Sequence, residues 1–402
     1  MSLSNITLTA AVRQNLLSLQ NTADLLATTQ GRLATGKKVN TALDNPTNFF
    51  TAAGLDARAS DISNLLDSIG NGVQVLQAAN TGITSLSKLV DTAKSIANQV
   101  LQQPTGYTAL ANITTTVGAV GTAADLTTGG TTSLQGKTLI LTPATGPALT
   151  LTFSNVVAAG NVNSLTALNS AISAAGIGLV ASISAGNFLT FTSTNDVASQ
   201  TLTVSGAAAA NTVSLTGTTV AAAPVAPTPD AVSQATRANL VNQYNQILTQ
   251  ITTTAQDASF NGVNLLNGDS LKLVFDETGK STSTIAGVTF NPAGLGLKAL
   301  TAGTDFVDTA STNSVLASLN TASITLRSQA SAFGANLSIV QIRQDFNKNI
   351  INVLQTGSSA LTLADSNEEA ANSQALSTRQ SIATSALSLA NQAQQNVLQL
   401  LR

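Results

Sequence analysis

The chain has 402 residues and a formal net charge of −2, and it contains no cysteine and no histidine. This composition excludes disulfides, thiol nucleophiles, histidine-based triads and zinc sites built from His or Cys. The balanced charge also argues against a nucleic-acid-binding surface, because such surfaces depend on clustered Lys and Arg.

The first 35 residues predict one amphipathic helix that ends at Gly36. Apolar and small residues recur there at steps of three and four, which places them on one stripe with the period of a coiled-coil seam. Such a helix is marginal in water on its own, so we expect it to pack against a partner helix. The predicted seam residues are Val12, Leu16, Leu19, Ala23, Leu26 and Leu33.

The segment 36–50 contains the turn signal Asn45-Pro46 and is predicted to be a linker. A second helical pattern runs from about residue 51 to residue 103. Three glycines interrupt it, and each costs about 1 kcal/mol relative to alanine in an isolated helix. Packing against other helices must therefore compensate for Gly70, Gly72 and Gly82.

Composition changes after Pro104, where charged residues become rare and Thr, Ala, Ser and Gly dominate. Alternating apolar and polar residues predict strands, and one helical segment lies among them. A proline-rich stretch at 221–230 is predicted to be a linker. Residues 107–227 are therefore predicted to form a separate, mostly β inserted domain. The strands are expected at 137–142, 148–156, 188–194 and 200–206, and the helix at 164–176.

Helical periodicity resumes at Ala231 and stops near residue 259, where two Asn-Gly pairs predict turns. Residues 271–281 predict a strand with a hairpin loop. From about residue 311 to the end the pattern is helical, with one interruption at Thr356-Gly357. The simplest partner for the stripe of one terminal helix is the stripe of the other, followed by the ends of neighbouring molecules. The second seam is predicted at Ala383, Ala386, Ala390, Ala393, Val397 and Leu400.

Residues that could carry chemistry are sparse. The sequence GKST at 279–282 lacks the earlier glycine of a phosphate loop, because Val274 stands at that place. A hairpin turn is the better interpretation. The acidic residues Asp365, Glu368 and Glu369 are predicted to lie on a solvated helix face rather than to bind a cation. The sequence shows no set of residues arranged for acid–base or nucleophilic catalysis. We therefore expect that the chain is not an enzyme and has no cofactor and no metal site.

The first residues lack the basic region and apolar core of a signal peptide, and no stretch has the length of a membrane span. If the protein leaves the cell, we expect a route that reads and cleaves no such signal peptide. We expect the protein to bind neither nucleic acid nor a membrane.

Motifs at both ends occur in the order typical of one protein family. The N-terminal matches are Arg13, Asn15, Leu16, Gln20, Leu33, Thr35, Gly36, Asn40, Ala42 and Asp44. The C-terminal matches are Ala390-Asn391-Gln392, Gln395-Asn396-Val397-Leu398 and Leu400-Leu401-Arg402. Over residues 1–103 and 231–402 the chain resembles bacterial flagellin of the alphaproteobacterial type.

The resemblance implies a mainly helical fold with a β-rich inserted domain. Its terminal helices would pair as a coiled coil in the inner tube of a filament, and the next segments would form a helical outer-tube domain with a β-hairpin. The expected domains are an N-terminal inner-tube helix and linker (1–45), an outer-tube helical segment (46–106), a surface-exposed β-rich insert (107–227), outer-tube helices and hairpin (228–355) and a C-terminal inner-tube helix (356–402).

The function implied by the resemblance is that of a structural subunit that polymerises through its terminal helices into the flagellar filament for motility. Expected partners are further copies of the chain, the flagellar type III export apparatus and its chaperone, and hook-associated and cap proteins. The expected location is the extracellular filament. Two alternatives stay open, a flagellin-like hook–filament junction protein and an adhesin displayed through the insert at 107–227.

Overall fold

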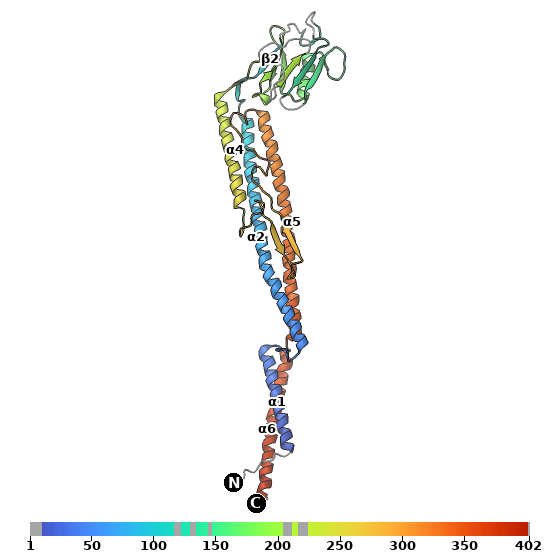
Figure 1. Ribbon diagram of the computed structural model, residues 1–402, viewed down its shortest axis with the longest axis vertical. Helices are drawn as coiled ribbons and strands as arrows, with labels where there is room; N and C mark the ends of the chain where they lie inside the picture. The colour runs from blue at the N-terminus through green and yellow to red at the C-terminus, as the bar shows by residue number, and fades with distance from the viewer. Residues whose placement is uncertain are drawn as a thin grey trace. The chain divides into compact units, whose positions relative to one another are not determined.

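The computed structural model describes residues 10–115, 122–128, 134–143, 147–203, 211–215 and 224–400. The chain divides into two compact units. Unit one contains residues 1–73, 272–284 and 338–402, and unit two contains residues 74–271 and 285–337. Two long helices, α2 (Pro46–Gln102) and α5 (Thr309–Thr362), contribute to both units (Figure 1).

The predicted fold class is confirmed, because long helices form both ends of the chain and a β-rich region is inserted between them. The five domain ranges expected from the sequence stay a prediction. Helix α1 (Ala10–Thr35) ends where the sequence predicts, because Gly36 adopts φ +68°, a left-handed conformation that glycine favours. The predicted start of this helix, in residues 1–9, lies outside the described residues.

Helix α2 begins at Pro46, five residues before its predicted start at residue 51, so the prediction of a linker up to residue 50 is wrong there. Pro46 opens the helix, at a position where its missing N–H would be unpaired in any case. The side-chain oxygen of Asn45 accepts a hydrogen bond from the backbone N–H of Asn48 at 3.0 Å. A turn signal in the sequence is thus a helix start in the structure.

The predicted interruption of the last helix at Thr356-Gly357 is also wrong. Helix α5 continues through Gly357, where an added Cβ would meet Leu55 at an ordinary contact distance of 3.5 Å. The helix is interrupted instead at residues 363–365, which separate α5 from helix α6 (Ser366–Leu400). Asp365 fixes this break, since its Oδ1 accepts hydrogen bonds from the N–H groups of Asn367 (2.9 Å) and Glu368 (3.3 Å).

Close packing explains two of the glycines in α2. In unit two, Gly82 packs against the segment that follows helix α4 (Ala231–Asp257). A Cβ on Gly82 would lie 2.6 Å from both Ala258 and Leu266. A Cβ on Gly72 would collide with Leu273 of the hairpin. The predicted hairpin is confirmed as strands β11 (Leu271–Val274) and β12 (Thr282–Ile285). These glycines would destabilise an isolated helix, but the absence of a side chain at each lets neighbouring segments pack closely against α2.

The insert contains two sheets and the short helix α3 (Leu165–Ala174), whose N-cap is Ser164, the first residue of the predicted helix. A three-stranded antiparallel sheet has the order β2-β7-β6, and a five-stranded sheet has the order β5-β4-β3-β9-β8. In the larger sheet Leu139 pairs with Leu151, and Phe153 and Phe191 are buried in the core of the insert. The strands are β2 (Asn112–Thr114), β3 (Thr138–Thr142), β4 (Leu149–Phe153), β5 (Asn161–Val162), β6 (Leu179–Ile183), β7 (Leu189–Ser193), β8 (Leu202–Thr203) and β9 (Asn211–Leu215).

All four predicted strands occur, although residues 204–206 of the last one lie outside the described residues. The interpretation of 221–230 as a linker is wrong over its described part. Strand β10 (Thr228–Pro229) pairs with β1 (Tyr107–Ala109), and Val225 forms an isolated bridge with Asn112. Prolines fit here because this two-stranded pairing has free edges.

A buried arginine of α4 stabilises the place where the chain passes between the helices and the insert. Arg237 donates hydrogen bonds to the carbonyl oxygens of Phe306 (2.8 Å) and Pro104 (3.0 Å). Burial lowers the pKa of its guanidinium below the ordinary value. Asp230 begins α4, and its backbone N–H donates to the carbonyl of Gly106 at 2.9 Å. The insert is therefore entered and left at one place.

Candidate assembly interface

Helices α1 and α6 lie side by side in unit one (Figure 1). Their pairing is antiparallel, since Arg32 near the end of α1 contacts Glu369 near the start of α6. Each helix therefore turns one face to the other and leaves the rest of its surface outside this contact.

The predicted seam of α1 is divided between these two kinds of surface. Val12 is buried, and Leu19, Ala23 and Leu26 are half-buried. Leu16 and Leu33 are 37% and 41% exposed. The contact with α6 thus leaves two of the six residues partly exposed.

The predicted seam of α6 is divided in the same way. Ala383 and Ala390 are half-buried, whereas Ala386 and Ala393 are exposed. Helix α6 extends to Leu400, but the side chains of Val397 and Leu400 lie outside those that the structure describes.

Several inward residues were missed by sequence reasoning because they are polar. On α1, Asn15 and Thr22 are half-buried and Thr29 is buried. They alternate with Val12, Leu19 and Leu26 at steps of three and four, the spacing of a coiled-coil seam. The inward residues of α6 follow the same spacing, and they are Glu369, Ser373, Leu376, Gln380, Ala383, Leu387 and Ala390.

Large apolar side chains remain on the outer surface of the α1–α6 pair. A soluble helix normally turns such residues to a core, so their exposure makes the α1–α6 pair a candidate surface for contact with another molecule. Among the side chains that the structure describes, these residues are Leu16, Leu17, Leu25, Leu33, Ile382 and Leu389.

A second exposed apolar stripe lies on the part of α5 that belongs to unit one. We call it the α5 stripe, and it consists of Ile339, Ile342, Phe346 and Val353. Their steps of three, four and seven place them on one helix face. Each side chain is more than half exposed in the chain. The buried positions Val340 and Leu354 lie on a different face of the same helix.

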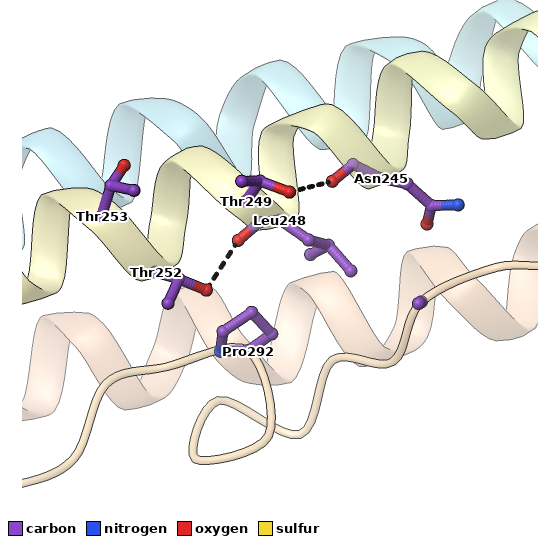
Figure 2. A pocket seen from close by; sticks show the side chains of 7 residues that line it. Asn245, Leu248, Thr249, Thr252, Thr253 and Pro292 are labelled. Carbon is purple, nitrogen blue, oxygen red and sulfur yellow. Dashed lines mark hydrogen bonds between the residues drawn. The ribbon is translucent and has the colours of Figure 1, made fainter.

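A shallow groove of about 410 Å³ runs along α4 in unit two. We call it the α4 groove, and Figure 2 shows that α4 supplies one wall and the loop containing Pro292 the other. None of its seven lining residues is charged. They are Asn245, Leu248, Thr249, Thr252, Thr253, Pro292 and Ala299.

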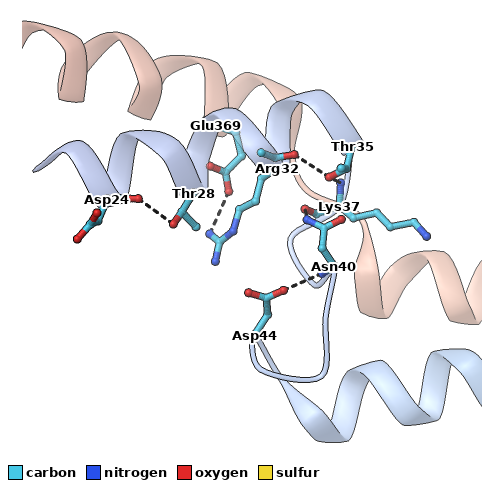
Figure 3. A network of polar contacts seen from close by, with 9 residues as sticks. Asp24, Thr28, Arg32, Thr35, Lys37, Asn40, Asp44 and Glu369 are labelled. Atoms are coloured by element: carbon cyan, nitrogen blue, oxygen red, sulfur yellow. Dashed lines mark hydrogen bonds and ion pairs between the residues drawn. The ribbon is translucent and has the colours of Figure 1, made fainter. Parts of the chain in front are cut away.

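The junction between the terminal helices and the next helices of unit one is held by backbone hydrogen bonds. The N–H of Lys38 donates to the carbonyl of Thr362 at 2.7 Å, and the N–H of Ala364 donates to the carbonyl of Gly36 at 3.0 Å. The two breaks in the helices are thus paired with each other. Arg32 donates to Glu369 at 3.3 Å beside this pairing (Figure 3).

Asp44 organises the turn that follows α1. Its Oδ2 accepts a hydrogen bond from the N–H of Asn40 at 2.9 Å (Figure 3) and another from the N–H of Thr41 at 2.9 Å. These bonds, first from Thr41 and then from Asn40, hold the pKa of the exposed Asp44 carboxyl below its usual value of 3.8. The turn is therefore strongest while Asp44 is ionised.

Other kinds of site find little support in the described part of the chain. Among those residues, no group of three or more His, Cys, Asp or Glu could hold a metal ion. Within the same ranges, no helix combines the length and apolar character required to cross a membrane.

Known protein families match both ends of this chain. The family model of the bacterial flagellin N-terminal helical region matches residues 6–140, and that of the C-terminal helical region matches residues 316–401. Together the two models span more than half of the chain.

Three flagellins of Caulobacter vibrioides are among the similar proteins. FljM is 30% identical over 164 residues, and FljK is 29% identical over 164 residues, in each case 40% of this chain and 59% of the relative. FljO is 29% identical over 160 residues, which are 40% of this chain and 58% of FljO. The match thus spans less than two thirds of each relative's length, but both terminal family models are present. The chain belongs to the bacterial flagellin family.

Proposed function

We propose that this chain is a structural subunit of the bacterial flagellar filament, which polymerises through its terminal helices and serves motility. The observation that carries the proposal is the set of large apolar side chains, such as Leu17 and Leu389, that stay exposed on the α1–α6 pair. Flagellins are structural proteins and not enzymes, so family membership supports a role in assembly.

The contact between α1 and α6 is weak by itself because half of its inward positions on α1 are polar. Burial of apolar area contributes roughly 25 cal/mol per Å², and Asn15, Thr22 and Thr29 add little of it. Ordering the backbone costs roughly 1–2 kcal/mol per residue. In a free subunit the terminal helices are therefore marginal, and contacts with neighbouring copies supply the burial that orders them.

The partners that follow from this function are other copies of the chain first of all. Flagellar type III export, with its chaperone, delivers the subunit to the growing tip, where hook-associated and cap proteins meet it. The subunit then lies in the extracellular filament, and no signal peptide is cleaved on the way. The mass of the protein recovered from filaments tests the last point.

Seeded growth tests the main proposal and separates it from a role at the hook–filament junction. Purified protein is added to short sheared flagellar filaments, and filament length is measured by electron microscopy. A filament subunit extends the seeds in proportion to the protein supplied. A junction protein binds the seed end once and stops growth, and seeds that do not lengthen at any concentration would contradict the proposal.

A further inference from the structure

Strand β6 of the insert lies at the edge of its sheet. It ends the order β2-β7-β6, and within the described ranges no strand lies beyond it. A free edge presents unpaired backbone N–H and C=O groups, which makes it a template for pairing with another chain. Proteins commonly protect such an edge with a charged residue or a proline, but the sequence of β6, LVASI, contains neither.

The register of β6 on β7 turns the backbone groups of its central residue, Ala181, to the free side. Residues of an antiparallel strand bond alternately toward the partner strand and away from it. Toward the β7 side, the N–H of Thr194 donates to the carbonyl of Gly178 at 2.8 Å. The N–H of Ser184 donates to the carbonyl of Phe188 at 2.8 Å on the same side. Ala181 lies three positions from both β6-side residues of these bonds, so its own groups point away from β7.

Asn169 of α3 occupies both hydrogen-bonding groups of Ala181. Its Nδ2 donates to the carbonyl of Ala181 at 2.9 Å, and its Oδ1 accepts from the N–H of Ala181 at 2.7 Å. The amide thus makes the two bonds that a residue of an added antiparallel strand would make. The other outward residues, Leu179 and Ile183, lie two positions to either side, so a strand that paired with both would have to displace Asn169.

The other sheet edges of the insert are closed too, as far as the structure describes them. On β2, the N–H of Asn112 donates to the carbonyl of Val225 at 3.2 Å, and its carbonyl accepts from the N–H of Val225 at 2.9 Å. The edge strands of the larger sheet, β5 and β8, have two residues each. Very short edge strands are a common protection against strand addition. The edge of β6 is longer, and another molecule can reach it, since Val180 is 47% exposed and a hollow of about 470 Å³ lies against it.

We propose that Asn169 keeps the edge of β6 closed to strand addition by a second copy of this chain. Without its amide, the β6 strands of two copies can pair antiparallel about a two-fold axis, with Ala181 opposite Ala181. The closed edge therefore keeps the inserts of different copies from pairing and leaves contacts between copies to other surfaces. This inference goes beyond the proposed function and does not rest on it, because the edge belongs to the single subunit.

Sedimentation velocity of the full-length free subunit, without filament seeds, tests the inference with two variants of one residue. Asn169→Ala removes both bonds, so we expect a dimer that grows with protein concentration beyond any association of the unsubstituted chain. Asn169→Asp loses the donor but places a negative charge at the edge, and such a charge opposes strand pairing, so we expect no added dimer. The matched control is Asn195→Ala, an exposed asparagine of the insert outside β6, which should sediment like the unsubstituted chain.

Hydrogen exchange of single amides shows where the copies pair. In dilute Asn169→Ala the amide of Ala181 should exchange at least about fivefold faster than in the unsubstituted chain, because it has lost its acceptor. Its protection should return as the protein concentration rises, since a paired edge restores an acceptor. The amide of Phe191, on the central strand β7, should stay protected throughout and report that the insert is folded.

A second substitution separates edge pairing from misfolding. Ile183→Pro removes an N–H that faces the free side, so it costs no bond to β7 and blocks an added strand. The double variant Asn169→Ala/Ile183→Pro should therefore sediment as the unsubstituted chain does. Association that persists in the double variant overturns the inference, as does equal association of Asn169→Ala and Asn169→Asp. An Asn169→Ala chain that stays monomeric, or that loses protection at Phe191, overturns it as well. Because no seeds are used, each of these results leaves the proposed function standing.

Discussion

The insert and the terminal helices solve the burial of apolar surface in opposite ways. The insert closes around its own core, where Phe153 and Phe191 are fully buried between its sheets and α3. Helices α1 and α6 turn polar residues such as Asn15 toward each other and leave Leu17 and Leu389 outside. A region that satisfies itself can fold alone, whereas a region with its apolar surface outside depends on neighbours.

Hydroxyl groups show the same difference. In the insert, Thr114 and Thr190 pair across neighbouring strands at 2.9 Å. On the helices, threonines bond back to their own backbone, as Thr22 does to Ser18 and Thr378 does to Gln374. Such helix faces stay polar in composition, yet they can be covered by another helix without losing hydrogen bonds.

The largest expected effect is loss of assembly on removing the end of α6. A chain lacking residues 383–402 should not extend filament seeds, because α1 loses about half of its partner helix and the exposed apolar residue Leu389 is removed. Hydrogen exchange of the insert should stay as slow as in the full chain. Seed extension by the truncated chain would show that the terminal pair is dispensable.

The reverse change should destabilise the insert and spare assembly. Phe153→Ala removes a fully buried ring and should lower the stability of the insert by about 3–5 kcal/mol, measured by denaturant titration followed through hydrogen exchange. Val157→Ala is the control, because Val157 is 99% exposed and its loss should change stability by less than about 0.5 kcal/mol. The independence of insert and assembly would be contradicted if the Phe153→Ala variant could not extend filament seeds although its terminal helices were intact.

Two glycines of α2 should respond in opposite directions to the same substitution. Gly82→Ala places a methyl 2.6 Å from Ala258 and Leu266 and should destabilise the chain by about 1–3 kcal/mol. Gly54→Ala meets nothing within 4 Å and should stabilise it by about 0.5–1 kcal/mol through helix propensity. Thermal unfolding of both variants measures the difference, and equal effects would refute the role assigned to close packing.

The smallest expected effect is the acid sensitivity of the turn at Asp44. Its folded pKa is lowered by the N–H groups of Thr41 and Asn40, so its contribution to stability is complete above the ordinary value of 3.8. The contribution is lost as pH falls through the lower folded pKa. A carboxyl titration by NMR measures this pKa, Asp44→Asn should abolish this part of the pH dependence, and a value at or above 3.8 would contradict the hydrogen bonding.

Sequence patterns sufficed where local residues decide the structure. The end of α1 at Gly36 and the strand Leu149–Phe153 follow from a glycine conformation and from strict alternation. Sequence patterns failed where a segment distant in the chain determines the local structure. Strands β1 and β10 are two or three residues long and exist through their pairing with each other.

The candidate interface was predictable only in outline. Periodicity located the helices that carry it, but the partner helix determines which residues turn inward, and it selects Asn15 and Thr22 in place of Leu16. The α4 groove combines residues 245–253 with 292–299, and no local pattern joins these two segments.

Hydrogen exchange on the dilute free subunit and on grown filaments tests the coupling of order to assembly most directly. The amides of α1 and α6 should exchange rapidly in the free subunit and slowly in filaments, while the buried strands of the insert stay protected in both. Equal and strong protection of α1 and α6 in the free subunit would contradict the account.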